Sequence, residues 1–567
     1  MFGIALLLAG LLVHPVMTNS KESDDEIMPA ASSAEPVAST AEPVASSAEP
    51  AASSAEPAAS SAEPVAASSH DLILRNGTII DGTGSPAFRG DIAVAGNRIV
   101  RIGNLTGITA QQVLDVTDFI VAPGFIDAHT HAATGLVREG LGHARPLLAQ
   151  GVTLIIANPD GSGPVDLEAQ RQQLETNRPG IHVAQLVPHG SIRRQVMGTE
   201  NRPATPAELE QMKALVREAM EYGAYGLSTG IFYVPGNFAP TEEYIALCQI
   251  VAEYGGVHQS HIRDESDYSI GVIAAVEELI AISRASGVTG VVTHIKALGT
   301  PVWGSSETII QQINEARDEG LSIYSDQYPY TASATSIMAA LVPAWAREGG
   351  NDVLRERLAD PVYQDSIFQG ITQNLIRRGG PDRILYRMFA EDRTVEGRTL
   401  AEVAEERQQQ PEIIILEQIK NGNPAIASFN MDENDIRAFM QQPWNMTSSD
   451  GGYVAFGIGT PHPRSYGSFP RKIRKYVYED SLLTLEKAVR SMTSLTAGVY
   501  GLQDRGLLGE GMVADIVVFD PETLTDRATY QQPHQYSEGM VHVIVNGRLA
   551  IKDRIFTDVR HGEVLRR

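Results

Sequence analysis

The chain has 567 residues, which is longer than one ordinary domain and enough to bury a large core. Its formal net charge of -24 argues against nucleic acid and anionic membranes as partners, because both carry charge of the same sign. A single cysteine, Cys248, excludes an intramolecular disulfide framework.

The N-terminal segment, residues 1–17, has an apolar core that is too short for a comfortable transmembrane helix. We predict a signal peptide. It lacks the Lys or Arg that such a peptide carries near its start, so a membrane anchor or a misassigned start codon stays an alternative.

Residues 18–69 form a low-complexity segment in which Ala-Glu-Pro recurs every seven residues from Ala34 to Pro64. Its prolines and serines prevent a helix and leave nothing to bury, so we predict a disordered Ala/Glu/Pro/Ser linker. Either it tethers an exported enzyme, in the periplasm or at the membrane, or it is a neutral expansion without a role.

Short strands and tight turns mark residues 70–122 and return at 500–567. Asn-Gly, Asp-Gly and Gly-Asn pairs separate runs rich in Ile, Val and Leu, which is typical of a small sheet. Because the two segments share this texture, we predict one β-sandwich domain built from both ends of the folded region.

Residues 123–499 alternate apolar strands with amphipathic helical stretches. Eight candidate strands with helices between them predict an α/β fold, a parallel (β/α)8 barrel. Cys248 lies in one of the helical stretches, where the apolar spacing favours a buried structural thiol over a nucleophile. Residues 345–442 have a mostly helical pattern, and we predict that they form an insertion over the barrel mouth.

The first barrel strand ends in "FIDAHTH", which places His129 and His131 one residue apart. Side chains alternate faces along a strand, so both imidazoles point to the same side and can reach one metal ion such as Zn²⁺. Taken alone, a His-x-His pair is as typical of surface or capping histidines as it is of a metal site. Active sites of barrels lie at the C-terminal face, however, so all residues that end the strands share one mouth. The other polar strand ends are Asp160, His189, His261, His294, Lys296, Tyr328, Tyr330 and Asp450.

Several longer motifs, in the order in which they occur, cover the chain from Asp71 to about Thr557. They include "PGFIDAHTH", "GLSTGIFYVPGNFAPTEE", "SHIRDES", "THIKALG", "DQYPYTA", "SSDGG", "PHPRSYGSFPR" and "MTSLTAGVYGLQDRGLLGEGMVADIVVFDP". Through these motifs the chain resembles the amidohydrolase superfamily and, within it, the N-acyl-D-amino-acid deacylases, or D-aminoacylases.

The resemblance implies a metal-dependent enzyme with one or two divalent ions, zinc above all. Carried over residue by residue, it implies that Asp450 is the catalytic carboxylate and that the metal ligands are His129, His131, His261 and His294. For the substrate's carboxylate it implies Lys296, Arg464 and either Tyr328 or Tyr330. An Arg fork and a Lys charge suit an anionic amino-acid end. His189 is a further substrate-binding candidate that would stabilise a developing oxyanion.

One position departs from the family pattern. The deacylases have Gly-Asn-Cys-Gly after the second strand, with the Cys bridging to the metal centre, whereas this chain has "NPDG" and therefore Asp160. Either Asp160 replaces the thiolate as a harder oxygen ligand, or it only begins the turn.

The implied reaction is hydrolysis of an N-acyl-D-amino acid, a small molecule, to a carboxylate and a D-amino acid. Other amidohydrolases, acting on cyclic amides or dipeptides, are the alternative within the fold; many of them need a bridging carbamylated Lys, and no Lys ends strands two to five. The alternative from another class is a catalytically silent binding protein. No nucleic acid partner and no membrane partner beyond an N-terminal anchor are expected.

Overall fold

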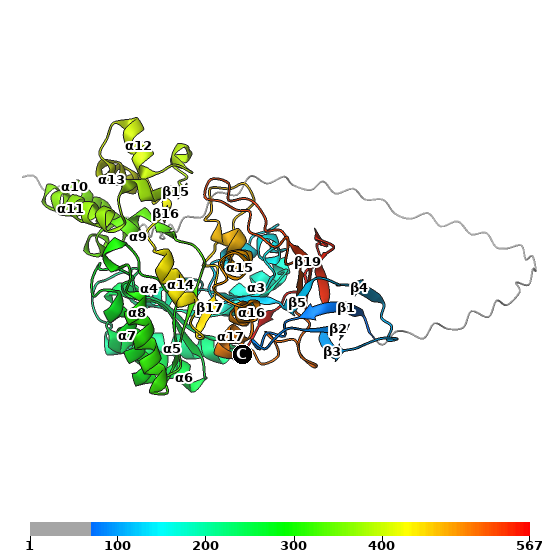
Figure 1. The fold of residues 1–567 in the computed structure, drawn as a ribbon. Coiled ribbons are helices and arrows are strands. Elements are labelled where there is room, and N and C mark those ends of the chain that lie inside the picture. The colour runs from blue at the N-terminus through cyan, green and yellow to red at the C-terminus, as the bar shows by residue number, and fades with distance from the viewer. Residues whose placement is uncertain (1–69) are drawn as a thin grey trace, which may run out of the picture. The chain divides into compact units, whose positions relative to one another are not determined.

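The computed structural model describes residues 70–567 (Figure 1). The predicted signal peptide or anchor at 1–17 and the predicted linker at 18–69 lie outside these residues. Among the described helices, none combines the length and the apolar character that a membrane crossing requires.

Parallel strands form a closed barrel. In order around it they are β6 (Phe125–Asp127), β7 (Val152–Ala157), β8 (His182–Gln185) continued by β9 (Val187–Pro188), β10 (Gly226–Gly230), β11 (Val257–His261), β12 (Thr289–Val292), β13 (Ile323–Gln327) and β17 (Asn445–Thr447). The ring closes where the Ala128 amide donates to the Thr447 carbonyl (3.3 Å) and the Asp450 amide donates to the His129 carbonyl (2.9 Å). The predicted (β/α)8 barrel is confirmed, with a third strand that is interrupted between β8 and β9.

Helices cover the outside of this barrel (Figure 1). They are α1 (Ala133–Leu136), α2 (Arg145–Leu148), α3 (Leu167–Asn177), α4 (His189–Met197), α5 (Pro206–Tyr222), α6 (Thr241–Glu253), α7 (Val272–Ser286), α8 (Ser306–Asp318), α14 (Glu433–Met440), α15 (Arg464–Ile473), α16 (Leu485–Met492) and α17 (Ser494–Tyr500).

Helix α5 illustrates how the sequence defines these elements. Thr205 caps its first turn: the Thr205 hydroxyl accepts from the Glu208 amide, and the Glu208 carboxylate accepts from the Thr205 amide. Pro206 follows at the first helical position, and Gly223 ends the helix with a left-handed backbone at φ 107°. The apolar face of α5 packs on α6, where Cys248 is buried and burial raises the pKa of its thiol. The predicted structural role of Cys248 agrees with this position.

The two ends of the folded region meet in one nine-stranded sheet. Its strands are β1 (Leu72–Ile79), β2 (Phe88–Ala95), β3 (Arg98–Gly103), β4 (Gln112–Asp115), β5 (Ile120–Pro123), β18 (Ile516–Phe519), β19 (Met540–Val545), β20 (Arg548–Lys552) and β21 (Ile555–Phe556). β5 pairs antiparallel with β18 and so joins the early strands to the late ones. The last strand, β22 (Val564–Leu565), instead pairs with β8 of the barrel.

The segment between β13 and β17 forms an insertion with its own apolar core. We expected a mostly helical segment at 345–442; the structure also contains a three-stranded antiparallel sheet, which begins earlier, at Ser333. The elements are β14 (Ser333–Ser336), α9 (Ile337–Leu341), α10 (Asn351–Ala359), α11 (Pro361–Arg377), β15 (Ile384–Met388), α12 (Leu400–Arg407), α13 (Pro411–Asn421) and β16 (Ala425–Ser428). The strands are four or five residues long and pair across long sequence distances, which leaves little local signal.

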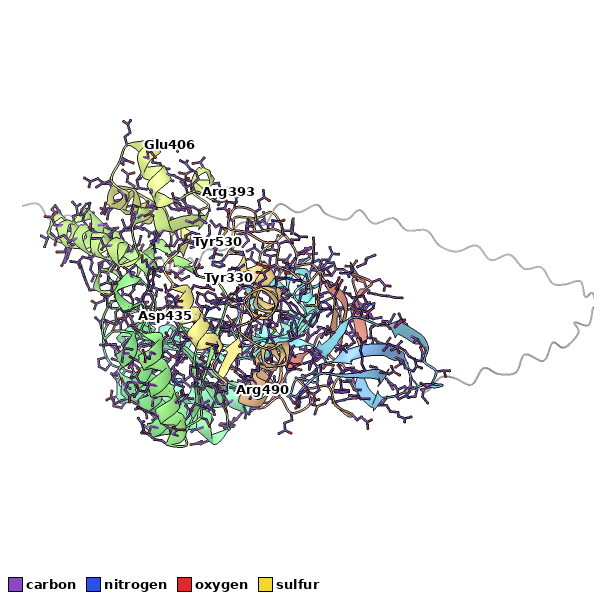
Figure 2. All side chains as sticks on the ribbon, viewed as in Figure 1. Tyr330, Arg393, Glu406, Asp435, Arg490 and Tyr530 are labelled. Carbon is purple, nitrogen blue, oxygen red and sulfur yellow. The ribbon has the colours of Figure 1, made fainter. Side chains whose placement is uncertain are left out.

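Figure 2 shows where this insertion meets the rest of the molecule. Arg393 and Glu406 lie on the insertion itself, whereas Tyr330 and Tyr530 lie between it and the barrel helix α14, which carries Asp435. The insertion therefore stands over the C-terminal face of the barrel, where the strand ends converge.

Candidate metal centre and substrate cavity

The strand ends bring four histidines and two aspartates into one cluster at the barrel mouth. Two overlapping groups have ligand atoms close enough to share an ion: the first is His129, His131, Asp160 and Asp450, and the second is Asp160, His261 and His294. These are all the metal-ligand candidates that the strand-end pattern and the resemblance named, together with the catalytic candidate.

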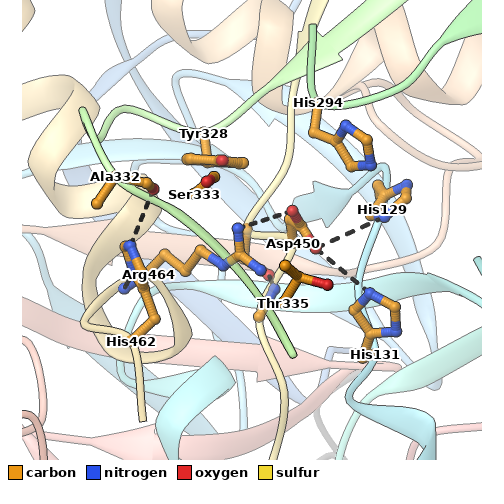
Figure 3. Close-up of polar contacts among 12 residues, drawn as sticks. His129, His131, His294, Tyr328, Ala332, Ser333, Thr335, Asp450, His462 and Arg464 are labelled. Atoms are coloured by element: carbon orange, nitrogen blue, oxygen red, sulfur yellow. Dashed lines mark hydrogen bonds and ion pairs between the residues drawn. The ribbon is translucent and has the colours of Figure 1, made fainter. Parts of the chain in front are cut away.

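The first group has the spacing of a metal site. Nε2 of His131 lies 3.4 Å from Oδ2 of Asp160 and 3.3 Å from Oδ1 of Asp450. Nε2 of His129 lies 3.5 Å from Oδ1 of Asp160. It lies 3.7 Å from Oδ1 of Asp450, a contact that Figure 3 shows as a dashed line. Tetrahedral zinc with bonds of about 2.0–2.1 Å separates its ligand atoms by roughly 3.3 Å. The distances therefore fit a divalent ion bound by nitrogen and oxygen donors.

Unsatisfied polar atoms point to the same conclusion. Both ring nitrogens of His129 and Oδ1 of Asp160 are buried and have no hydrogen-bond partner within residues 70–567. Buried polar atoms are normally paired, so these atoms need a ligand that the protein itself does not provide.

The second group shares Asp160 with the first. Nε2 of His294 lies 3.4 Å from Oδ1 of Asp160 and 2.9 Å from Nδ1 of His261. Asp160 therefore belongs to both groups.

Left-handed backbone conformations position three of these side chains. The φ angles are 55° at Asp160, 36° at His294 and 46° at Asp450, each just after a barrel strand. Such angles are uncommon in residues other than glycine. They persist where contacts with the surrounding structure hold the backbone in this conformation, as at functional sites. The sequence left open whether Asp160 is a ligand or a turn residue; it does sit in the turn, but its carboxylate faces the histidines.

Opposite charges stabilise one another within the cluster. Burial by itself would raise the pKa of Asp160, but His129 and His131 hold it well below its usual range. Burial lowers the pKa of His131, yet its contacts with Asp160 and Asp450 outweigh this and raise that pKa to about 9. Burial lowers the pKa of His261 to about 4, which keeps its imidazole in the neutral, metal-binding form.

Glu265 is a buried member of the site that sequence reasoning missed. Its Oε1 accepts from Nζ of Lys296 at 2.6 Å and lies 3.0 Å from Nδ1 of His294. Burial raises the pKa of Glu265, but Lys296 and the two nearby histidines bring it below its usual range. A carboxylate on Nδ1 directs Nε2 of His294 towards Asp160, which is how second partners orient metal ligands. The available signal was its place in "SHIRDES", four residues after His261.

A cavity of about 480 Å³ opens beside the cluster and is lined by Lys296, Tyr328 and Arg464. Arg464, the first residue of α15, makes a 2.7 Å ion pair with Oδ2 of Asp450 (Figure 3). Its guanidinium carbon lies 4.7 Å from the centre of the Tyr328 ring, and Nζ of Lys296 lies 5.8 Å from the same centre. Two cations therefore flank one aromatic ring next to Asp450.

Two predicted substrate-binding residues lie elsewhere. Tyr330, the alternative to Tyr328, does not line this cavity; its ring packs against Arg471. We also expected His189 to face the mouth, and the structure corrects this. The chain turns into α4 at His189, so the buried ring bonds Glu243 on α6 at 2.9 Å. The strand-end rule fails here because helix α4 begins at His189 itself, directly after β9.

Comparison with known proteins agrees with this geometry. The family model described as "Amidohydrolase family" matches residues 112–551. The chain belongs to the amidohydrolase family. The family predicted from the motifs is confirmed.

This amidohydrolase has curated relatives that match over nearly their whole length. It is 34% identical to a D-aminoacylase of Alcaligenes xylosoxydans xylosoxydans over 88% of this chain and 98% of that one. It is 35% identical to an N-acyl-D-glutamate deacylase of the same organism over 88% of this chain and 96% of that one. A solved N-acyl-D-glutamate deacylase from Bordetella bronchiseptica, complexed with zinc and a phosphonate inhibitor, superposes with a TM-score of 0.75. That structure is 33% identical and covers 88% of this amidohydrolase and 100% of its own chain.

Proposed function

We propose that this amidohydrolase is a zinc-dependent hydrolase that cleaves the amide bond of N-acyl-D-amino acids to a carboxylate and a D-amino acid. The observation that carries the proposal is the position of Asp450, which lies between the histidine groups and the carboxylate-binding candidate Arg464. The D configuration rests on the relatives, which are named for D-amino acids.

The metal-binding residues would be the two groups described above, which share Asp160. Zinc held by these residues would lower the pKa of water and act as a Lewis acid towards the scissile carbonyl. Because Asp160 belongs to both groups, the donor set accommodates one ion or two.

Asp450 is placed to move the protons. Burial raises its pKa, but Arg464 and His131 lower it below its usual range, so the carboxylate is ionised and can accept a proton at Oδ1. It would take this proton from the attacking water and return it to the leaving nitrogen. An ionised general base beside the metal ligands is what the reaction needs at neutral pH.

Lys296, Tyr328 and Arg464 would bind the substrate's α-carboxylate. Lys296 and Arg464 supply charge, and Arg464 can offer a second guanidinium nitrogen while one faces Asp450. Neither metal group contains a lysine. This argues against a cyclic-amide hydrolase of the kind that bridges its metals with a carbamylated Lys.

Metal analysis combined with a substrate panel tests the proposal. We expect the full-length protein to bind zinc and to release D-amino acids from N-acetyl-D-amino acids, with the L enantiomers hydrolysed far more slowly. Asp160→Ala should bind less metal, because a shared ligand is lost.

Other outcomes of this experiment point elsewhere. Metal binding without hydrolysis of any panel member would redirect the search to cyclic amides or dipeptides. No metal would leave a silent binding protein on a hydrolase scaffold. Unchanged metal content in Asp160→Ala would confine Asp160 to the turn.

A further inference from the structure

The cavity carries more positive charge than one substrate carboxylate needs. Five cationic side chains line it, namely Arg194, Lys296, Arg378, Arg387 and Arg464, against three acidic ones, Asp160, Glu265 and Asp450. A divalent ion at the histidines would widen this excess.

Most of these cations already have partners. Lys296 pairs with Glu265 at 2.6 Å and Arg464 with Asp450 at 2.7 Å. Arg194 donates to the Val234 carbonyl, and Arg378 donates to the hydroxyls of Tyr268 and Ser428. Their hydrogen-bonding capacity is therefore partly used within the protein.

Arg387 is different. Its Nε is buried without a hydrogen-bond partner, and no ion pair of its guanidinium occurs within residues 70–567. Burial and the nearby Arg464 lower the pKa of Arg387 to about 10, so it is still a cation at neutral pH. A cation in a cavity wall without acceptors is costly unless a ligand anion binds to it.

The backbone fixes this side chain next to the carboxylate-binding candidates. Arg387 lies on β15 of the insertion, and its carbonyl accepts from the Thr460 amide at 2.7 Å. Thr460 begins the "TPHPR" loop that ends at Arg464. The contact therefore brings one arginine of the insertion and one arginine of the barrel to the same side of the cavity.

We propose that Arg387 binds a second carboxylate of the substrate, so that the enzyme prefers N-acyl-D-amino acids that are dianions. This rests on the function proposed above. The second carboxylate belongs either to the amino-acid side chain, as in aspartate or glutamate, or to the acyl group, as in a succinyl amide. Both place the same anion opposite the same guanidinium.

Steady-state kinetics of Arg387→Met test the proposal. The probes are N-acetyl-D-glutamate and N-acetyl-D-aspartate, N-succinyl-D-methionine, and the monoanion N-acetyl-D-methionine as reference. We expect the ratio of kcat/KM for the preferred dianion to that for the reference to fall by about tenfold to hundredfold, mainly through KM, since a charge-assisted hydrogen bond is lost. Arg387→Lys should retain part of the ratio.

Arg393→Met is the matched control, because Arg393 is an exposed arginine of the same insertion outside the cavity. It should leave the ratio unchanged. N-acetyl-D-glutamate and N-acetyl-D-aspartate carry the second carboxylate on the side chain, and N-succinyl-D-methionine carries it on the acyl group. The compound whose ratio falls therefore shows which end of the substrate reaches Arg387. A ratio that is the same in wild type and Arg387→Met for every dianion would overturn the proposal.

Calorimetric binding separates this proposal from the proposed function. If no probe is hydrolysed, the function is wrong, and binding of N-acetyl-D-glutamate relative to N-acetyl-D-methionine still decides the role of Arg387. If Arg387→Met weakens the binding of N-acetyl-D-glutamate but not that of N-acetyl-D-methionine, the site is supported. If the ratio of the two affinities is the same in Arg387→Met and wild type, the site is overturned. If Arg387→Met unfolds at a lower temperature than wild type, Arg387→Lys carries the comparison.

Discussion

At the scale of single residues, the site depends on side chains held by unusual backbone. Asp160 and Asp450 have left-handed φ angles of 55° and 46°. Aspartate and asparagine tolerate this region better than most residues, because a short polar side chain can bond locally. Substitution of Asp by Asn therefore changes charge and basicity with little change to the backbone, which makes the chemical role testable.

Asp450→Asn tests the proton-transfer role. An amide cannot accept a proton at neutral pH, so kcat should fall by about 10²–10⁴-fold while KM changes much less. Kinetics on the best N-acetyl-D-amino acid would measure this, with zinc content determined on the same samples. A kcat within threefold of wild type at equal zinc content would refute the assignment of Asp450 as the general base.

At the scale of elements, helix α15 runs from the cavity, at Arg464, to a buried lysine, Lys472. Arg464 begins the helix beside Asp450, and Lys472 lies two turns later. Nζ of Lys472 is buried and donates to the hydroxyls of Thr447 on β17 (2.8 Å) and Ser491 on α16 (2.9 Å). No carboxylate faces it in these contacts, and burial lowers its pKa from 10.5 to about 7.

Lys472→Met tests this packing through pH. Above about pH 7 the folded protein holds Lys472 neutral, whereas the unfolded chain keeps it charged up to about pH 10.5. The unfolded state then binds one more proton, so the stability of the wild type should rise with pH across this window, by up to about 1.4 kcal/mol per pH unit.

Urea unfolding at several pH values would measure the effect. Lys472→Met should lose this slope and be the more stable protein below pH 7. Lys475→Met, which removes a partly exposed lysine paired with Asp480, should keep the slope. Parallel pH profiles for wild type and Lys472→Met would exclude a buried, titrating Lys472.

At the scale of the whole molecule, the sheet domain and the barrel are joined by a buried ionic network. Asp515, at the start of β18, accepts from Arg505 (2.7 Å) and lies 3.1 Å from Nε2 of His182 on the barrel strand β8. The Asn546 amide donates to the same carboxylate. Burial raises the pKa of Asp515, but His182 and Arg505 lower it to about 2.

Asp515→Ala should destabilise the chain by roughly 3–5 kcal/mol, since it removes the carboxylate nearest to the buried Arg505. The urea midpoint followed by circular dichroism would show the loss. Glu538→Ala removes an exposed partner of Arg527, outside this network, and should shift the midpoint little. If the two variants have equal midpoints, the network does not hold the domains together.

The sequence by itself determined the barrel, the sheet domain and most of the cluster. Apolar strands that alternate with helices predict the barrel. Residues at the C-terminal ends of its strands all face the same end of the barrel, so the places of His129, His261, His294 and Asp450 could be predicted. The sequence also identified Arg464, through its motif.

Only the tertiary structure decided which side chains face the cavity. Tyr328 and Tyr330 are two residues apart, and packing against Arg471 takes Tyr330 away. Helix α4 begins at His189, whose ring bonds Glu243 on α6. Arg387 looks in sequence like any surface arginine of a helical segment, and it becomes part of the cavity wall because β15 pairs with β16, some 40 residues further along the chain. Such contacts depend on distant segments meeting in space, and no local pattern of residues encodes them.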